Sequence, residues 1–128
     1  ESNHQEQIIG FCKELGISVS AFFILGYEGD TEITMKNTVD YAIKLNTLLA
    51  RFSVSTPYPG TGYYEQLKKE GRILTDDFEN YDQFNLVYKH QNLTPEQVRK
   101  SLETALRRYY FRFSYFSNLF KYLLRKSI

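Results

Sequence analysis

Two short motifs hold the residues of this sequence best suited to chemistry. Residues 22–31 read FFILGYEGDT and residues 55–61 read STPYPGT. In each motif a hydrophobic segment leads into a glycine- or proline-rich turn and then into the start of a helix. Parallel α/β sheets bind ligands at the carboxyl ends of their strands, so the two motifs predict a ligand-binding edge.

Each turn offers its own kind of contact. Gly26 has no Cβ, so either a ligand can approach its backbone closely or the glycine only permits the turn. Asp30 is a candidate helix cap, with a catalytic acid as the alternative. Pro57 and Pro59 make the second turn rigid, and this turn can present its carbonyls or the Tyr58 ring to a ligand.

Other kinds of site find little support. The single cysteine, Cys12, excludes an internal disulfide framework and is expected to be a small buried side chain. His4 and His90 have no partners at metal-ligand spacing and are expected to be ordinary surface histidines. No Ser-His-Asp set, zinc spacing or phosphate-binding loop with its lysine occurs. A metal used by this chain must therefore be held by residues outside it.

Residues 1–71 alternate between predicted helices and strands. A helix over 5–15 ends at Gly16, and the apolar run 17–25 predicts a strand buried on both faces. Asp30 or Thr31 then caps a helix that ends near Leu45. A second strand covers 50–56, and a short helix covers 63–69 and ends at Gly71. The inner stripe expected for the helix before Leu45 is Ile33, Met35, Val39, Ala42 and Ile43.

This order predicts an α/β fold with parallel strands joined by a right-handed crossover. Two parallel strands cannot cover their own faces and edges, so we expect a βαβα fragment of a larger partial (β/α) barrel or doubly wound sheet. Arg51, Ser53 and Ser55 alternate along the second strand. One of them is expected to point into a barrel interior, but the sequence does not fix which face does so.

The second half divides into an irregular acidic and aromatic connector, 72–93, and a helical extension, 94–128. The connector has a candidate short strand near 86–88. Thr94, Pro95 and Gln97 form a helix start with the spacing of a capping box. An apolar stripe then predicts one long helix or two in tandem, bent near Ser114. The members of that stripe are Val98, Leu102, Ala105, Leu106, Tyr109, Phe113, Phe116, Phe120 and Leu123.

Charge and aromatic residues concentrate toward the end of the chain. Residues 94–128 carry a net charge of +6, whereas the preceding 93 residues carry −5. The basic aromatic segment 107–126 has several interpretations: a helix docked on the barrel, peripheral contact with a membrane or lipid-like substrate, or docking on a partner protein. Nucleic acid is disfavoured because no recognised binding module is present. With no membrane-spanning run or signal sequence, we expect a cytoplasmic protein.

The motifs, taken together, resemble the radical S-adenosylmethionine enzymes. ILGYEGDTEITM is similar to that family's fifth-strand motif, and STPYPGT followed by YYEQLKKEG is similar to its sixth strand and following helix. The later LTPEQV and RRYYFRFSY resemble the cobalamin-binding branch, which includes relatives of the anaerobic magnesium-protoporphyrin monomethyl ester oxidative cyclase. Two departures stand out: Glu28 replaces a usual proline, and Phe113 stands where relatives often carry proline.

The resemblance implies a function for the parent protein. It implies S-adenosylmethionine, a 4Fe-4S cluster held by a CxxxCxxC motif upstream of Glu1, and cobalamin as an optional cofactor. Such enzymes cleave S-adenosylmethionine reductively to a radical that abstracts hydrogen from a substrate, leading to methylation or oxidative ring closure. The S-adenosylmethionine contacts it implies here are Ile24, Leu25, Gly26, Asp30, Pro57 and Tyr58.

This interpretation makes the chain the C-terminal part of an oxidoreductase- or methyltransferase-type enzyme, inactive alone. Its partners would be the upstream part of the same polypeptide and a small-molecule or lipid-like substrate. The alternative is a non-catalytic interaction module whose basic aromatic helix docks on a membrane surface or a partner protein.

Overall fold

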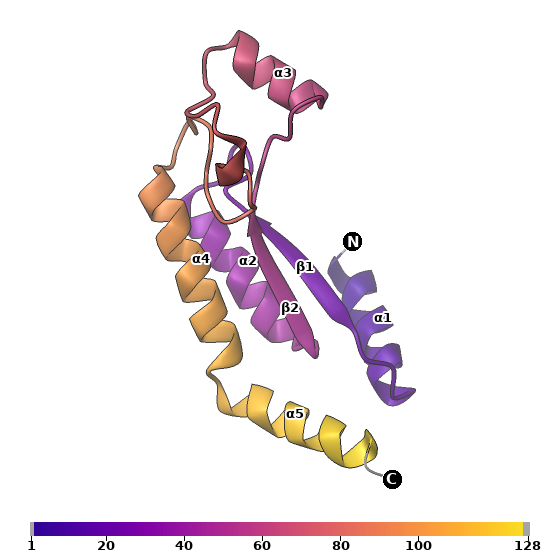
Figure 1. Ribbon diagram of the computed structural model, residues 1–128. Helices are drawn as coiled ribbons and strands as arrows, with labels where there is room; N and C mark the ends of the chain where they lie inside the picture. The colour runs from indigo at the N-terminus through magenta and orange to yellow at the C-terminus, as the bar shows by residue number, and fades with distance from the viewer. Residues whose placement is uncertain (1, 127–128) are drawn as a thin grey trace.

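A two-stranded parallel sheet lies at the centre of the structure, which is a computed structural model describing residues 2–126, with the side chains of residues 4–125 (Figure 1). The described residues also form five α-helices. The elements follow in the order α1 (Ser2–Glu14), β1 (Ser20–Leu25), α2 (Glu32–Leu45), β2 (Leu49–Val54), α3 (Gly62–Lys69), the 3-10 turn η1 (Phe78–Asn80), α4 (Pro95–Tyr110) and α5 (Phe113–Lys126).

The strands pair in parallel, as the α/β prediction requires, with Phe22 opposite Arg51 and Ile24 opposite Ser53. β1 begins three residues later than predicted. The reason is the end of α1: Gly16 adopts a φ of +72°, and the N–H of Ile17 donates back to the carbonyl of Cys12 over 2.8 Å. This helix-closing turn takes up the first residues of the apolar run.

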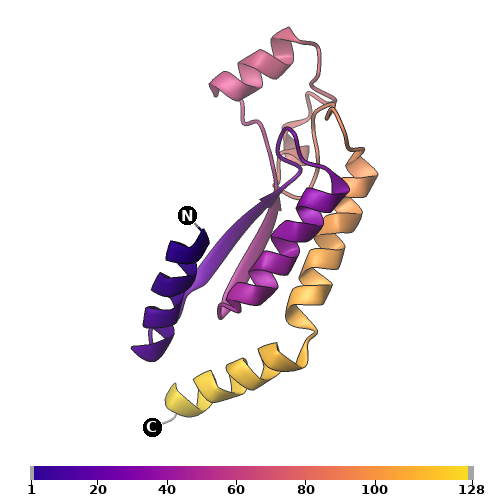
Figure 2. The same ribbon diagram turned by 180° about the vertical axis from the view of Figure 1, so that it is seen from behind.

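Helices cover one face of the sheet. Seen from behind in Figure 2, α2 and α4 lie across the strands, and Leu25, Phe52 and Val54 form a buried core with Met35 and Val98. On the opposite face, toward the viewer in Figure 1, none of the helices of residues 2–126 lies. The prediction that the first strand is buried on both faces is therefore wrong for this chain.

Two exposed side chains establish that result. Phe22 is 69% exposed and Ile24 is 56% exposed, and both lie on the uncovered face. Ile33, predicted to be in the inner stripe of α2, is also exposed, because it lies on the side of that helix that faces away from β1 and α4. The other members of that stripe are buried or partly buried.

Local capping chemistry fixes where the helices begin. Thr31 is the N-cap of α2, and it exchanges side-chain and backbone hydrogen bonds with Thr34. Thr94 caps α4 in the predicted way: its hydroxyl accepts from the N–H of Gln97, and the Gln97 side chain accepts from the N–H of Thr94 over 2.8 Å. Both arrangements satisfy backbone N–H groups that a helix start leaves unpaired.

The C-terminal segment is two helices, not one. The break falls at Phe111 and Arg112, just before the predicted bend near Ser114. The Arg112 guanidinium donates to the carbonyl of Ile43 over 3.0 Å and to Asn46 Oδ1 over 2.6 Å, and it lies 4.2 Å from the centre of the Tyr109 ring. These contacts tie the break to the C-terminal end of α2.

After the break, α5 runs across the end of the sheet where the strands begin (Figure 1). Tyr115 and Leu119 pack inward, whereas Phe113, Phe116 and Phe120 are exposed. The predicted apolar stripe therefore ends at Tyr109: its later members, Phe113, Phe116 and Phe120, do not continue the buried face. None of the helices described between residues 2 and 126 is both long and apolar enough to cross a membrane.

Candidate functional site

The carboxyl ends of β1 and β2 bring the two sequence motifs to the same edge of the sheet. The N–H of Ser55 donates to the carbonyl of Leu25 over 2.9 Å, continuing the strand pairing into both turns. α3 and the irregular connector lie at this same end of the molecule (Figure 1). The two motifs therefore lie together at one edge of the sheet, as the parallel pairing requires.

The residues of the first motif face in different directions. Ile24 projects from the uncovered face, whereas Leu25 is fully buried on the helix side. Gly26 has a φ of +70°, and a Cβ placed on it would lie 3.2 and 3.3 Å from the two methyl groups of Val98. That side of Gly26 is filled by α4, so its missing Cβ serves the turn and the packing of α4.

Asp30 closes the first turn on itself. One carboxylate oxygen accepts the N–H of Tyr27 over 3.0 Å, and the other accepts the hydroxyl of Thr34 over 2.7 Å. Thr31 takes the capping position, so Asp30 is a brace for the turn and not the cap proposed for it.

The second motif places its two predicted contacts differently. Pro57 is fully buried, and Tyr58 is 41% exposed. The Tyr58 hydroxyl accepts a hydrogen bond from Gln83 Nε2 over 2.9 Å. Of the two residues, Tyr58 alone can present its ring to a ligand.

Side chains of the connector hold the first turn through hydrogen bonds to the backbone carbonyls of that turn. Tyr88 donates its hydroxyl hydrogen to the carbonyl of Gly26 over 2.7 Å, His90 Nε2 lies 2.9 Å from the carbonyl of Tyr27, and Asn92 donates to the carbonyl of Asp30 over 3.1 Å. These three side chains alternate along residues 88–92. Tyr88 and Asn92 pair the carbonyls of Gly26 and Asp30, and His90 adds a second hydrogen bond to the carbonyl of Tyr27, which also accepts the N–H of Asp30 over 2.8 Å.

An ion pair between Arg72 and Glu28 also braces the first turn. Arg72 Nη1 lies 2.6 Å from Glu28 Oε1, and both side chains are largely buried. Arg72 Nε also donates to the carbonyl of Lys89 over 2.9 Å. The hydrogen bond that Arg72 donates to the Glu28 carboxylate raises the pKa of Arg72, which keeps the guanidinium charged. The proline usual at the position of Glu28 could not form this pair.

The expectation of a surface histidine at position 90 is wrong. His90 is only 7% exposed, and the N–H of Asn92 donates to its Nδ1 over 3.0 Å. Since Nδ1 accepts, the proton sits on Nε2, which donates to the carbonyl of Tyr27. Residues 72–92 have no regular periodicity, so no sequence pattern pointed to this role.

The structure shows which residues of β2 lie on the uncovered face of the sheet. Arg51 lies on this face, with its guanidinium 5.7 Å from the centre of the Phe22 ring across the strand pair. Ser53 lies beside Ile24 on the same face, whereas Ser55 is buried. The open face thus presents an aromatic ring, a cation, an aliphatic side chain and a hydroxyl.

Metal-binding side chains do not gather at this edge. Within the described part of the chain, no group of three or more His, Cys, Asp or Glu residues is placed to hold a metal ion. Cys12 is half-buried on α1, and one thiolate cannot ligate a 4Fe-4S cluster. The residues present do not fit the cluster that the family resemblance implies.

Comparison with known proteins gives clear relatives, although no protein-family model matches the chain. An uncharacterized methyltransferase of Pyrococcus horikoshii is 32% identical over 101 residues, covering 79% of this chain and 22% of the relative. Bacteriochlorophyllide d C-12(1)-methyltransferase of Chlorobaculum tepidum is 26% identical over 105 residues, covering 82% of this chain and 23% of the relative.

A third relative is of the kind that the sequence resemblance indicated. Anaerobic magnesium-protoporphyrin IX monomethyl ester cyclase of Cereibacter sphaeroides is 26% identical over 105 residues, covering 82% of this chain and 17% of the relative. The homologues of this chain are bacteriochlorophyllide methyltransferases and this cyclase, of the radical S-adenosylmethionine family, at low identity over most of the chain. The resemblance identified from the two motifs is thereby confirmed. The chain spans about a fifth of the length of these relatives.

The His90 brace of this radical S-adenosylmethionine homologue can be tested by substitution. His90→Phe keeps a ring but removes both hydrogen bonds, so the N–H of Asn92 loses its acceptor and the carbonyl of Tyr27 keeps only the N–H of Asp30. We expect the free energy of unfolding, measured by urea denaturation, to fall by about 1–3 kcal/mol. His4→Phe, on an exposed side chain of α1, is the control and should change it by less than about 0.5 kcal/mol. Equal effects of the two substitutions would contradict the brace.

Buried phenols make stability depend on alkaline pH. Burial raises the pKa of Tyr63, Tyr81, Tyr88 and Tyr115 above the ordinary value of 10.0. Above that pH the unfolded chain loses phenolic protons that the folded chain keeps. The contribution of these phenols to the free energy of unfolding is therefore fully present below pH 10 and falls as the pH rises above it.

The measurement is the free energy of unfolding in urea at about pH 8 and about pH 10.5. We expect a lower value at the higher pH, and a smaller drop in Tyr88→Phe, because that variant has one buried phenol fewer. A drop of the same size in Tyr88→Phe as in the native chain would contradict the contribution of Tyr88.

Proposed function

We propose that this chain forms the wall of a radical S-adenosylmethionine barrel that lines the cofactor and the substrate. The observation that supports it best is the uncovered sheet face with Phe22, Ile24, Arg51 and Ser53. In a parallel barrel the helices lie outside and the opposite strand face points inward. α2 and α4 cover one face here, which leaves the other as the inward one.

The braced strand ends support the same proposal. Binding sites in parallel sheets need their turns held rigidly at the carboxyl ends of the strands. Ile24 and the exposed ring of Tyr58 are the side chains that we assign to S-adenosylmethionine. Leu25, Gly26, Asp30 and Pro57 would shape the wall through the backbone, because their side chains or Cα atoms are already packed or hydrogen-bonded.

The cluster would be supplied by another part of the protein, since this chain carries one cysteine. When bound, a 4Fe-4S cluster would provide the electron for reductive cleavage of S-adenosylmethionine. This chain would hold the nucleoside and keep water from it by presenting Phe22 and Ile24. We propose cobalamin as a further cofactor of the intact protein, as the branch resemblance implies.

The relatives suggest a class of reaction. Their names describe methyltransferases acting on bacteriochlorophyllide d and a cyclase acting on magnesium-protoporphyrin IX monomethyl ester. We propose methyl transfer or oxidative ring closure on an unreactive carbon for the intact protein. The chain alone would be inactive.

The test uses the intact protein that contains this chain, reconstituted anaerobically with iron and sulfide. S-adenosylmethionine and a strong reductant are added, and 5′-deoxyadenosine is measured. We expect Ile24→Trp to lower its rate of formation by at least about tenfold, because the indole would occupy the space of the nucleoside. Gly26 is a poor probe, since a side chain there would collide with Val98.

Ile33→Trp is the matched control, because Ile33 is also exposed but lies on α2. It should leave 5′-deoxyadenosine formation unchanged. A folded intact protein that binds no iron-sulfur cluster, or one in which both substitutions act alike, would overturn the proposal.

The exposed face of α5 favours a second candidate function, docking on a membrane surface or partner protein. Phe113, Phe116 and Phe120 are exposed, and the basic Lys121 lies beside them. Phe116→Ser with Phe120→Ser tests it by co-sedimentation with anionic vesicles. Arg108 and Arg112 are unsuitable probes because they bond to Asp40 and to the end of α2. Unchanged sedimentation would exclude membrane docking through this face.

A further inference from the structure

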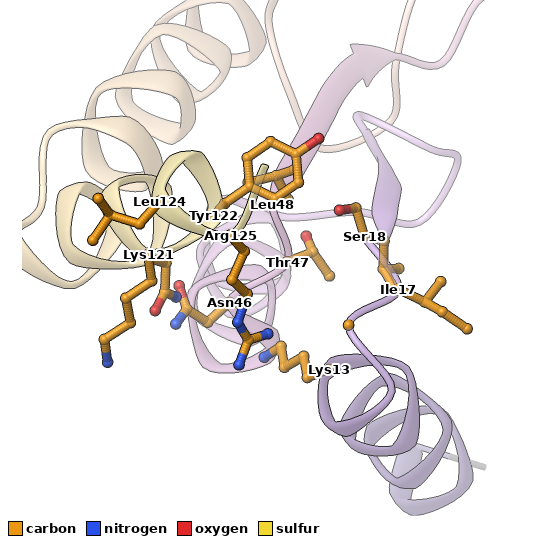
Figure 3. Close-up of a pocket in the computed structure, with 13 residues that line it drawn as sticks. Lys13, Ile17, Ser18, Asn46, Thr47, Leu48, Lys121, Tyr122, Leu124 and Arg125 are labelled. Atoms are coloured by element: carbon orange, nitrogen blue, oxygen red, sulfur yellow. The ribbon is translucent and has the colours of Figure 1, made fainter. Parts of the chain in front are cut away.

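A cavity of about 790 Å³ opens at the end of the sheet opposite the candidate site, where the strands begin (Figure 3). It lies between α5 and the loops that lead into β1 and β2. Three cations from two helices line it: Lys13 of α1, and Lys121 and Arg125 of α5. No aspartate or glutamate is among its lining residues.

These cations are poorly neutralised. Among the described side chains, 4–125, neither Lys121 nor Arg125 forms an ion pair or a hydrogen bond. The Lys13 ammonium donates to the carbonyl of Leu45 over 2.7 Å but has no carboxylate partner there. Burial, and then the positive charge of Arg112, lower the pKa of Lys13. Positive charge is therefore crowded at this place, and a bound anion would relieve the repulsion.

The loops add neutral groups to the lining. Ser18 and Asn118 provide a hydroxyl and an amide, and Asn46 has its amide oxygen already bonded to Arg112. In Figure 3 the charged ends of Lys13, Lys121 and Arg125 extend to the same side of the cavity. A small group with several acceptor oxygens can reach cations from both helices there.

We propose that this cavity binds the phosphate group of an organic phosphate, with Lys13, Lys121 and Arg125 as its cationic contacts. A phosphate carries more charge than a carboxylate and matches a set of three cations better. The cavity has the size of a small-molecule site, so it has room for an organic body beyond the phosphate. This inference does not depend on the proposed function at the other end of the sheet.

The phosphate can come from a soluble compound or from a lipid headgroup. The second source arises because Leu124 lines the cavity and the neighbouring Phe116 and Phe120 are exposed on α5. Soluble inorganic phosphate and vesicles containing phosphatidylglycerol are the two probes that separate these sources. Neutral phosphatidylcholine vesicles are the reference for the second.

The experiment measures binding of both probes to the full 128-residue chain by calorimetry and co-sedimentation. We expect saturable binding of at least one probe in the native chain. Lys121→Gln with Arg125→Gln should weaken it roughly twenty-five-fold, at about fivefold for each cation. Binding of inorganic phosphate identifies a soluble ligand, whereas binding of anionic vesicles alone identifies a lipid.

The control is Lys89→Gln with Lys100→Gln, which removes the same charge from exposed positions outside the cavity. It should leave the affinity unchanged, and circular dichroism verifies that both variants are folded. Equal loss in the two double variants would overturn the proposal, because the binding would then follow net charge alone. Absence of binding to both probes by the folded native chain would overturn it as well.

Discussion

Replacing Tyr88 with alanine is expected to lower the free energy of unfolding by about 3–5 kcal/mol, the usual cost of deleting a buried aromatic side chain. Tyr88 is fully buried, and its ring lies 5.8 Å from that of Tyr63 and 5.9 Å from that of His90. Its hydroxyl bonds to the carbonyl of Gly26. The substitution therefore leaves a cavity and an unpaired carbonyl beneath the candidate site.

A milder change separates these two costs. Tyr88→Phe keeps the ring and removes only the hydrogen bond, so we expect a loss of about 1–3 kcal/mol. Tyr58→Ala, on a half-exposed ring, is the control and should cost less than Tyr88→Ala. Urea denaturation measures all three. A loss in Tyr88→Ala no larger than that in Tyr58→Ala would show that the brace does not stabilise the fold.

Gly26→Ala is expected to lower the free energy of unfolding by about 2–5 kcal/mol. A φ of +70° costs an alanine about 1–2 kcal/mol, and crowding in a packed interior adds about 1–3 kcal/mol. Both terms apply because the new methyl group would lie 3.2 Å from a methyl group of Val98.

Gly29→Ala is the matched control in the same turn. Its φ is +93°, but no atom lies within 4 Å of the added methyl group, so only the backbone cost applies. Gly26→Ala combined with Val98→Ala should be less harmful than the sum of the single changes, because Val98→Ala makes room for the methyl group. Strict additivity would contradict the proposed collision.

Local chemistry made the helix boundaries predictable. Thr94 with Gln97, Gly16 and Gly71 act through their immediate neighbours, so short sequence patterns were enough to place them. The parallel pairing followed as well, because a strand, a helix and a strand joined by short loops have few other arrangements. The meeting of the two motifs at one edge was a consequence of that pairing.

The features that the sequence did not predict depend on contacts between distant residues. Phe22 and Ile24 belong to a continuous apolar run, which is typical of a strand covered on both faces and does not show which face this chain leaves open. His90 and Arg112 are polar residues whose partners are backbone carbonyls of another segment. Such partners have no side-chain pattern, so periodicity could not identify the brace or the break before α5.

The spacing of these long-range bonds has a consequence for synthesis on the ribosome. Tyr88 bonds to a residue 62 positions earlier, Tyr109 to one 62 positions earlier, and Arg112 to one 69 positions earlier. At typical translation speeds, a finished strand waits roughly 3–14 seconds for its partner to be made. During that interval the apolar strands of the nascent chain are accessible to chaperones, because the residues that complete their contacts have not yet been made.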